Sequence, residues 1–197
     1  MQLTTIVLSL FGFFIVARAA DSDLNLPYPL VPFQYNGILG GHNVQLNGTI
    51  QDIYAQMKEL HPDFELEHAI QSRAEASNLT THDIANTFDY YCCPVPGHKW
   101  QWALGPHILD GIKYLKGIDI CDVGASSCVR IGCSWNSAIY LCNDNRFKIT
   151  PMCNYIASYA KDLIDKCSEY PPVHTFLTCG QEFDTDGYNV IVREDRC

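Results

Sequence analysis

Hydrophobic residues recur at helical spacing most clearly between residues 151 and 167. One apolar stripe in this segment runs through Cys153, Ile156, Ala160, Leu163 and Cys167. Thr150 precedes it as an N-cap residue, and Pro151 suits the first helical position. Similar spacing over shorter segments predicts further helices at residues 50–60, 64–76, 81–88 and 106–116.

β-Branched and aromatic runs predict strands in the second half of the chain. Residues 128–133 and 138–142 flank a break at 135–137, so we expect a hairpin there. Alternation places Val129, Ile131, Cys133, Ile139 and Leu141 on one apolar face, and Cys128, Arg130, Tyr140 and Cys142 on the other. A short helix over residues 137–143 is the alternative for the second arm.

A second hairpin is expected at the C-terminal end. Residues 173–179 and 188–193 are strand-like, and the intervening Asp-Thr-Asp-Gly at 184–187 is a strong turn signal. Together the predicted elements define an α+β fold. A small disulfide-stapled antiparallel sheet packs against helix 151–167, and a helical N-terminal region precedes it.

The chain divides into three parts. Residues 1–19 predict a signal peptide, because a short apolar run ends at an Ala-Arg-Ala cleavage signal. Residues 20–91 lack cysteine and combine an extended, Pro- and Gly-rich arm at 20–48 with the predicted helices. Residues 92–197 are the disulfide-stapled α+β domain. No later segment predicts a membrane span, so we expect a secreted, extracellular protein.

The cysteines all follow the predicted signal peptide and are Cys92, Cys93, Cys121, Cys128, Cys133, Cys142, Cys153, Cys167, Cys179 and Cys197. Ten cysteines in a secreted chain predict five disulfides, and their spacings match no zinc site, so neither metal nor cofactor is expected. The adjacent Cys92 and Cys93 need separate, distant partners, because a bond between neighbours is strained.

Cys153 and Cys167 lie about 21 Å apart along a helix, too far to bond each other. They therefore pin the two ends of the helix to different places. The hairpin at 128–142 is the nearest source of thiols, and we expect it to receive both helix ends and the Cys92-Cys93 segment.

The net charge and two glycosylation sequons limit the classes of partner that we expect. The chain carries 22 acidic and 13 basic residues, a net charge of −9, which disfavours binding to nucleic acid. Asn47 and Asn78 each begin an N-x-S/T sequon, which predicts glycosylation at the surface. The expected partner is an unidentified extracellular protein or glycan.

One candidate binding surface is aromatic. Trp100 and Trp102 share a side of an extended segment, which with His98 predicts a ledge for a sugar or a peptide. The alternative is an aromatic plug over a small core. The turn that contains Asp184 and Asp186 is the second candidate surface.

Two enzyme-like or metal-binding patterns occur near that turn. Its acids resemble the opening of a calcium loop, but Arg193 occupies the position where a Glu ligand is required, so we reject calcium binding of that type. Glu182 and Asp184 lie two residues apart on one strand, which is suitable geometry for the carboxylate pair of a glycoside hydrolase. Such an enzyme would need these acids to share a cleft with His98 or His107.

Two longer motifs carry a resemblance to known proteins. They are Cys-x4-Cys-Ser-Trp-Asn-Ser-Ala-Ile-Tyr-Leu-Cys-Asn-Asp-Asn at 128–145 and Gly-Gln-Glu-Phe-Asp-Thr-Asp-Gly-Tyr-Asn-Val-Ile-Val at 180–192. Both resemble small secreted cysteine-rich proteins of filamentous fungi, which are often counted as effector candidates. The order of cystine-bearing strands, helix and closing strand is also similar to fungal killer toxins of the small α/β-sandwich type.

These resemblances supply no catalytic residues. They imply a secreted, non-enzymatic interaction protein, associated with virulence, that binds an extracellular host or competitor target. A small hydrolase acting on cell-wall polysaccharide is one alternative. A growth inhibitor like the killer toxins, which block ion channels or growth, is the other.

Overall fold

The computed structural model describes residues 25–76, 87–172 and 175–197. Its elements are β1 (Leu30–Val31), β2 (Gln34–Leu39), β3 (His42–Asn47), α1 (Ile50–Leu60), α2 (Leu66–Ala76), β4 (Thr87–Cys92), β5 (Ala103–Leu104), α3 (Gly105–Leu115), β6 (Ser127–Ser134), β7 (Ser137–Asn143), α4 (Cys153–Cys167), β8 (Ser168–Glu169), β9 (Leu177–Thr178), β10 (Gly180–Asp184) and β11 (Tyr188–Glu194). The predicted α+β class is confirmed.

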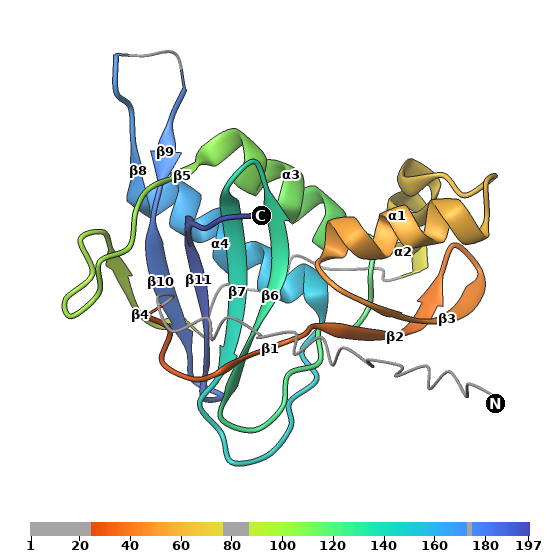
Figure 1. Ribbon diagram of the computed structural model, residues 1–197, viewed down its shortest axis with the longest axis horizontal. Coiled ribbons are helices and arrows are strands. Elements are labelled where there is room, and N and C mark those ends of the chain that lie inside the picture. The colour runs from red at the N-terminus through yellow and green to blue at the C-terminus, as the bar shows by residue number, and fades with distance from the viewer. Residues whose placement is uncertain (1–24, 77–86, 173–174) are drawn as a thin grey trace, which may run out of the picture.

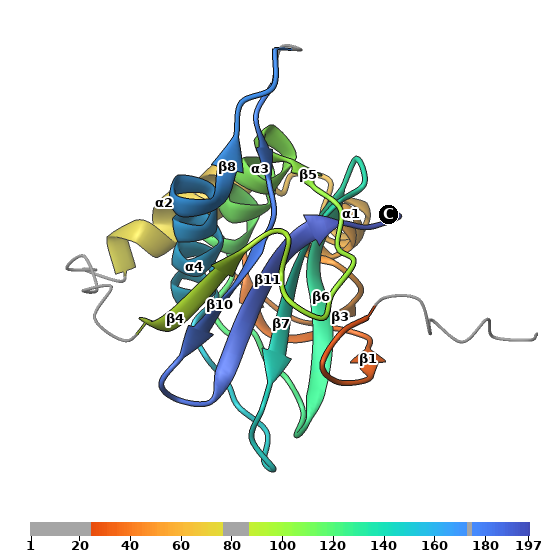
Figure 2. The same ribbon diagram turned by 90° about the vertical axis from the view of Figure 1, so that its left-hand side faces the viewer.

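The main sheet has six strands in the order β1-β6-β7-β11-β10-β4. All neighbours are antiparallel except β1, which runs parallel to β6. Helices α3 and α4 lie against one face of this sheet, and α1 lies beside its β6 end (Figures 1 and 2). One hydrophobic cluster between these layers joins α1, through Ile53, to Ile131 of β6 and Leu163 of α4.

The opposite face of the sheet carries a second cluster. It is built on Tyr140 and Ile191 from the central strands, with Trp100 from the segment between β4 and β5 packed over them. Both faces of the sheet are therefore covered, which explains why all seven residues of β7 are buried.

The hairpin β6–β7 is confirmed at the expected place. The strands pair from Ser127 opposite Asn143 to Ser134 opposite Ser137, and Trp135 and Asn136 alone form the turn. Both turn residues have positive φ, 48° and 56°, which is the backbone of a two-residue type I′ turn. The helical alternative for the second arm is wrong.

One residue of the hairpin lies on the other face from that expected. A register shift between Arg130 and Gly132 inserts an extra residue into β6, which is a β-bulge. Since alternation restarts after the bulge, Cys133 joins Cys128 and Tyr140 in the Trp100 cluster instead of facing the helices. Uninterrupted alternation predicted the opposite.

The second predicted hairpin is present, but the prediction for its first strand is wrong. The strand β10 at 180–184 pairs with β11, not residues 173–179. Of that expected arm, Leu177 and Thr178 form β9 in a separate sheet ordered β5-β9-β8, and positions 173–174 lie outside the described residues. The turn follows Asp184 as predicted, with Gly187 at φ 74°.

Helix α4 begins at Cys153, two residues later than predicted. Isolated bridges join Ile120 to Met152 and Val123 to Ile149, and they hold the preceding chain extended. Met152 is therefore the N-cap and makes no side-chain cap, whereas Thr150 was expected to cap the helix. Helix α3 confirms the expectation for residues 106–116.

The five disulfides join Cys92 to Cys167, Cys93 to Cys179, Cys121 to Cys153, Cys128 to Cys142 and Cys133 to Cys197. Distant partners for the two adjacent cysteines are confirmed, as are separate anchors for the two ends of α4. The prediction that the hairpin cysteines bond the two helix ends is wrong, because Cys128 and Cys142 bond each other across the hairpin. The helix is anchored instead to the strand β4 and to the loop at Cys121.

The segment before Cys92 is mixed rather than only extended and helical. Residues 34–47 form the hairpin β2–β3, where an irregular arm was expected, because Gly40 and Gly41 supply a turn with positive φ. The helix α1 starts with a capping box between Thr49 and Asp52. The helix expected at 81–88 lies mostly outside the described residues, and its last two positions belong to the strand β4.

Candidate binding site

The expected aromatic ledge is largely built into the fold. Trp100 is only 7% exposed, and its indole Nε1 donates a hydrogen bond to the Asn25 carbonyl at 3.2 Å. The His98 ring packs on Trp100 with 4.2 Å between centroids, and its Nδ1 lies 3.0 Å from the same carbonyl. Trp102 is partly buried against the same cluster. This arrangement matches the alternative interpretation, an aromatic plug that ties the N-terminal arm to the sheet.

The two acids of the other predicted surface, the β10–β11 turn, differ in exposure. Asp186 is exposed in the turn, but Asp184 is buried on the helix side of the sheet. Its carboxylate accepts hydrogen bonds from the hydroxyls of Tyr155 and Tyr159 and from the Asp186 backbone. Burial and the hydrogen bond to Asp184 raise the pKa of Tyr159, so its hydroxyl stays protonated and donates. Trp100 lies on the opposite face, so the structure does not bring these two surfaces together.

The carboxylate pair expected for a hydrolase is also buried. Glu182 is fully buried beneath α4, where its Oε1 pairs with Lys166 Nζ at 2.8 Å. Burial raises the pKa of Glu182 although Lys166 opposes this. His98 lies on the other side of the sheet and His107 lies on α3. The acids and histidines therefore share no cleft in the described part of the chain.

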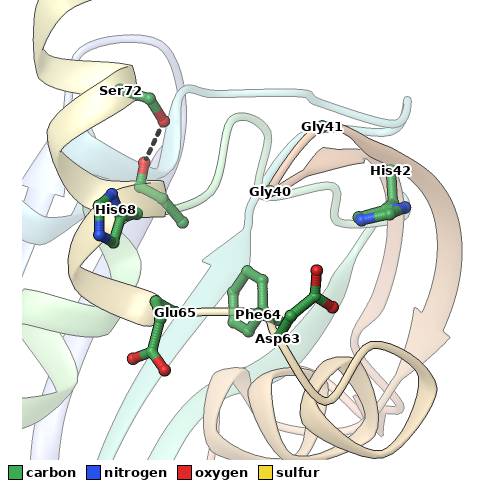
Figure 3. Close-up of a pocket in the computed structure, with 9 residues that line it drawn as sticks. Gly40, Gly41, His42, Asp63, Phe64, Glu65, His68 and Ser72 are labelled. Atoms are coloured by element: carbon green, nitrogen blue, oxygen red, sulfur yellow. Dashed lines mark hydrogen bonds between the residues drawn. The ribbon is translucent and has the colours of Figure 1, made fainter.

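A pocket of about 560 Å³ lies elsewhere, between the β2–β3 turn and α2. Figure 3 shows Phe64 at its centre, with His42 and Asp63 on one side and His68 of α2 on the other. His42 stacks on His61 with 3.5 Å between ring centroids. Over the ranges that the structure describes, no group of three or more His, Cys, Asp or Glu side chains is placed to hold a metal ion.

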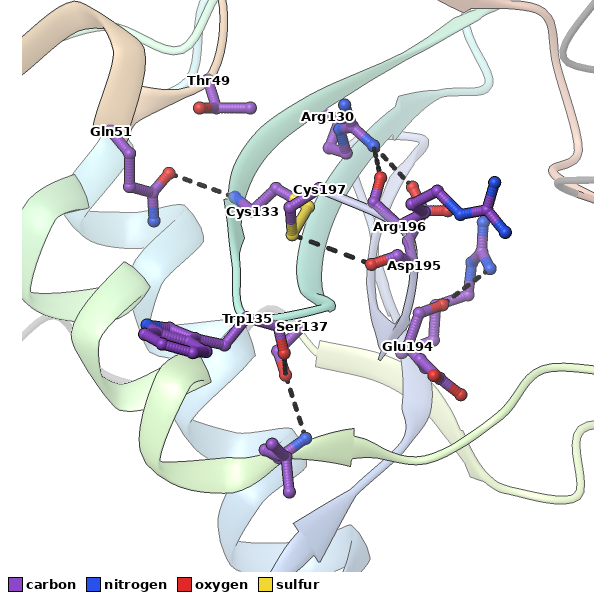
Figure 4. Close-up of a disulfide and its surroundings, with 12 residues drawn as sticks. Thr49, Gln51, Arg130, Cys133, Trp135, Ser137, Glu194, Asp195, Arg196 and Cys197 are labelled. Atoms are coloured by element: carbon purple, nitrogen blue, oxygen red, sulfur yellow. Dashed lines mark hydrogen bonds and ion pairs between the residues drawn. A yellow bond between two sulfur atoms is a disulfide. The ribbon is translucent and has the colours of Figure 1, made fainter. Parts of the chain in front are cut away.

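Trp135, which the sequence places only in a turn, is the most exposed tryptophan. Its side chain is 75% exposed at the end of the β6–β7 hairpin. One side of the indole faces the ring of His107 on α3, with 5.7 Å between centroids and 20° between planes. This end of the hairpin, with Trp135, Asn136, His107 and Gln51 of α1, is called the Trp135 ledge below; Figure 4 shows Trp135 and Gln51.

Hydrogen bonds from two other elements fix the hairpin around the ledge. Gln51 Oε1 accepts a hydrogen bond from the Cys133 backbone at 3.1 Å, which caps the outer edge of β6. The Ser137 hydroxyl donates to the Trp135 carbonyl at 3.3 Å and accepts from the Leu104 backbone at 3.0 Å. The helix α1 and the strand β5 therefore both hold the turn in place.

The C-terminal tail fixes the ledge from a third side. Cys197 is bonded to Cys133, and the Asp195 backbone donates to the Asn136 carbonyl at 3.1 Å. The Asp195 carboxylate in turn accepts hydrogen bonds from Arg130, at 2.7 Å, and from the Tyr140 hydroxyl. A rigid support of this kind reduces the entropy that a binding residue loses when its partner docks.

The sequence carries a local signal at Trp135. Two-residue hairpin turns of this type favour Asn and Gly, because both positions need positive φ. A tryptophan at the first position is unusual, because large side chains rarely adopt positive φ. Of the two predicted glycosylation sites, Asn47 is exposed at the end of β3, and Asn78 lies outside the described residues.

Comparisons with family models, with curated proteins and with solved structures found no match to this chain. The class of protein therefore follows from the structure alone. Five disulfides in an α+β chain of this size indicate a small secreted or extracellular protein. Within the described ranges, no helix is both long and apolar enough to cross a membrane.

Proposed function

We propose that this protein is a secreted, non-enzymatic interaction protein of the effector type, which binds an extracellular host or competitor target through the Trp135 ledge. The observation that carries the proposal is Trp135 itself. A large indole is held 75% exposed at φ 48°, on a hairpin whose arms are joined by one disulfide and which a second disulfide ties to the C-terminal tail.

Folding alone does not explain this residue. A left-handed backbone costs an L-residue about 1–2 kcal/mol, and Asn or Gly avoids most of that cost. Because the indole is mainly exposed, it recovers little of the stabilisation that a buried tryptophan provides. Strained positions that the surroundings hold in place are typical of functional sites. An exposed aromatic on such a position is suited to contact a partner.

Binding is better supported than hydrolysis. Glu182 and Asp184, the acids that a hydrolase would use, are committed to Lys166 and to tyrosine hydroxyls beneath α4. A catalytic acid has to reach its substrate to within about 3 Å, directly or through one water. Neither carboxylate meets this condition while α4 is packed on the sheet.

The test is a retention assay with a matched control. Fluorescently labelled protein is incubated with washed leaf cell walls, with immobilised leaf apoplastic proteins and with intact cells of competing fungi. Trp135→Ala is compared with Phe147→Ala, because Phe147 is also 65% exposed but follows the far end of the same hairpin. We expect retention on at least one target to fall at least tenfold for Trp135→Ala and to stay unchanged for Phe147→Ala. Equal retention of both variants and wild type would contradict the proposal.

A further inference from the structure

The Trp135 ledge combines one apolar face with neutral polar groups. The indole packs on His107 on one side, and its 75% exposure leaves the other side open. Gln51 uses only its Oε1 inside the protein, so its Nε2 remains a free donor among the described residues. The Asn136 carboxamide follows Trp135 directly, is exposed and has no hydrogen-bond partner in the same described set. Figure 4 shows Gln51 and Trp135 on the same side of β6.

The size of the ledge argues against a protein partner. A tryptophan side chain buries about 150–250 Å² when it is fully covered. A stable protein interface needs about 800 Å² from each partner. No other strongly exposed large hydrophobic residue is present on the hairpin turn, α1 or α3 next to Trp135: Leu60 lies at the far end of α1, and Leu109 is only moderately exposed. One sugar ring matches the available apolar area.

The charge around the ledge argues against an anionic ligand. Asp110 lies beside His107, with 3.5 Å between its Oδ2 and the His107 Nδ1. Glu194 is exposed on the strand that leads to the tail, and the exposed Arg196 in the tail carries the opposite charge. With a net charge of −9, the molecule as a whole repels anionic ligands such as uronates and phosphates.

We propose that the Trp135 ledge binds a neutral glycan. One pyranose ring stacks its C–H face on the open side of the indole, and the carboxamides of Gln51 and Asn136 form hydrogen bonds with its hydroxyls. This inference rests on the proposed function, since it names the ligand class of the same site.

Three variants separate the groups involved. Trp135→Ala removes the stacking face. Asn136→Gly removes one carboxamide and keeps a residue that favours positive φ. Gln51→Glu keeps the oxygen that accepts from the Cys133 backbone but removes the free N–H donor. Phe147→Ala is the control for the loss of an exposed aromatic ring elsewhere.

The experiment is an NMR titration of the intact, oxidised protein with cellohexaose, laminarihexaose, mannohexaose and chitohexaose, and with oligogalacturonate as the charged comparison. The Trp135 indole N–H is assigned from its absence in Trp135→Phe. We expect at least one neutral hexasaccharide to shift this signal with a dissociation constant below about 1 mM. Trp135→Ala should weaken binding at least tenfold, Asn136→Gly and Gln51→Glu about threefold to tenfold, and Phe147→Ala not at all.

The titration and the retention assay together distinguish failure of the glycan inference from failure of the proposed function. If no neutral hexasaccharide moves the Trp135 signal, but Trp135→Ala still loses retention on apoplastic proteins, the ligand is a protein and the glycan inference is wrong. A preference for oligogalacturonate also overturns it. If Trp135→Ala is retained like wild type on every target, the proposed function fails with it.

Discussion

Trp100 packs over the β6–β7 hairpin and Trp135 lies in its turn, yet the two indoles have opposite environments. Trp100 is 7% exposed, and its N–H is bonded to the Asn25 carbonyl. Trp135 is 75% exposed on a left-handed backbone, and His107 covers only one of its sides. The first indole stabilises the fold, because it covers Tyr140 and ties down the N-terminal arm. The second contributes little to stability and is rigidly presented, so the comparison separates a folding residue from a binding residue of the same type.

The largest expected effect is at Trp100. Trp100→Ala empties a closed cluster and should lower the free energy of unfolding by about 3–5 kcal/mol. Denaturant titration monitored by far-UV circular dichroism measures this directly. If the variant loses less than about 1 kcal/mol, Trp100 is not the plug described above, and the contrast with Trp135 disappears.

The next effect concerns the tail that supports the ledge. Replacing Cys133 and Cys197 together by Ser removes a cross-link between residues 64 apart, with an expected loss of about 2–4 kcal/mol. Because the tail also holds the Asn136 carbonyl, retention on the target should weaken in the same variant. Unchanged retention at a temperature where the variant is folded would show that the tail does not position the ledge.

A smaller and opposite effect is expected at Trp135. Trp135→Asn places a residue that tolerates positive φ in the turn, so stability should rise by about 1 kcal/mol while retention falls. Thermal unfolding of this variant beside wild type measures the gain. A loss of stability similar to that of Trp100→Ala would mean that Trp135 is also a folding residue.

The smallest expected effect is the pH dependence of stability that comes from the buried Glu182. The pKa of Glu182 is raised by burial in the folded protein, so its protonated form is favoured by folding. Stability from this group is present below its usual pKa and declines as the pH rises above it. Relative to Glu182→Gln, wild type should therefore lose stability as the pH rises above 4.5, the usual pKa of a glutamate. A relative gain with rising pH would contradict the burial argument, and the ledge variants should show no such difference.

Local chemistry explains which elements were predictable. The hairpin around Trp135, the helix α3 and the separate anchors for Cys153 and Cys167 follow from spacing and turn residues near each position. The errors arise from distant contacts. The bulge beside Arg130 reversed the face of Cys133, and bridges from residues 120 and 123 delayed the start of α4.

The candidate site was the least predictable part. Two tryptophans near a histidine suggested a ledge at Trp100 and Trp102, but exposure depends on whether another segment covers them. The N-terminal arm covers Trp100 through Asn25, more than seventy residues away in sequence, and local periodicity carries no signal of that contact. Trp135 carried a local signal, a bulky residue in a turn that favours Asn and Gly.

The most direct test of the central claim measures stability and binding together in Trp135→Ala, with Phe147→Ala as control. We predict that the free energy of unfolding changes by less than about 0.5 kcal/mol in both variants, and that only Trp135→Ala loses at least tenfold in retention. If Trp135→Ala is destabilised by several kcal/mol, or if it is retained as well as Phe147→Ala, Trp135 is not the binding residue of this protein.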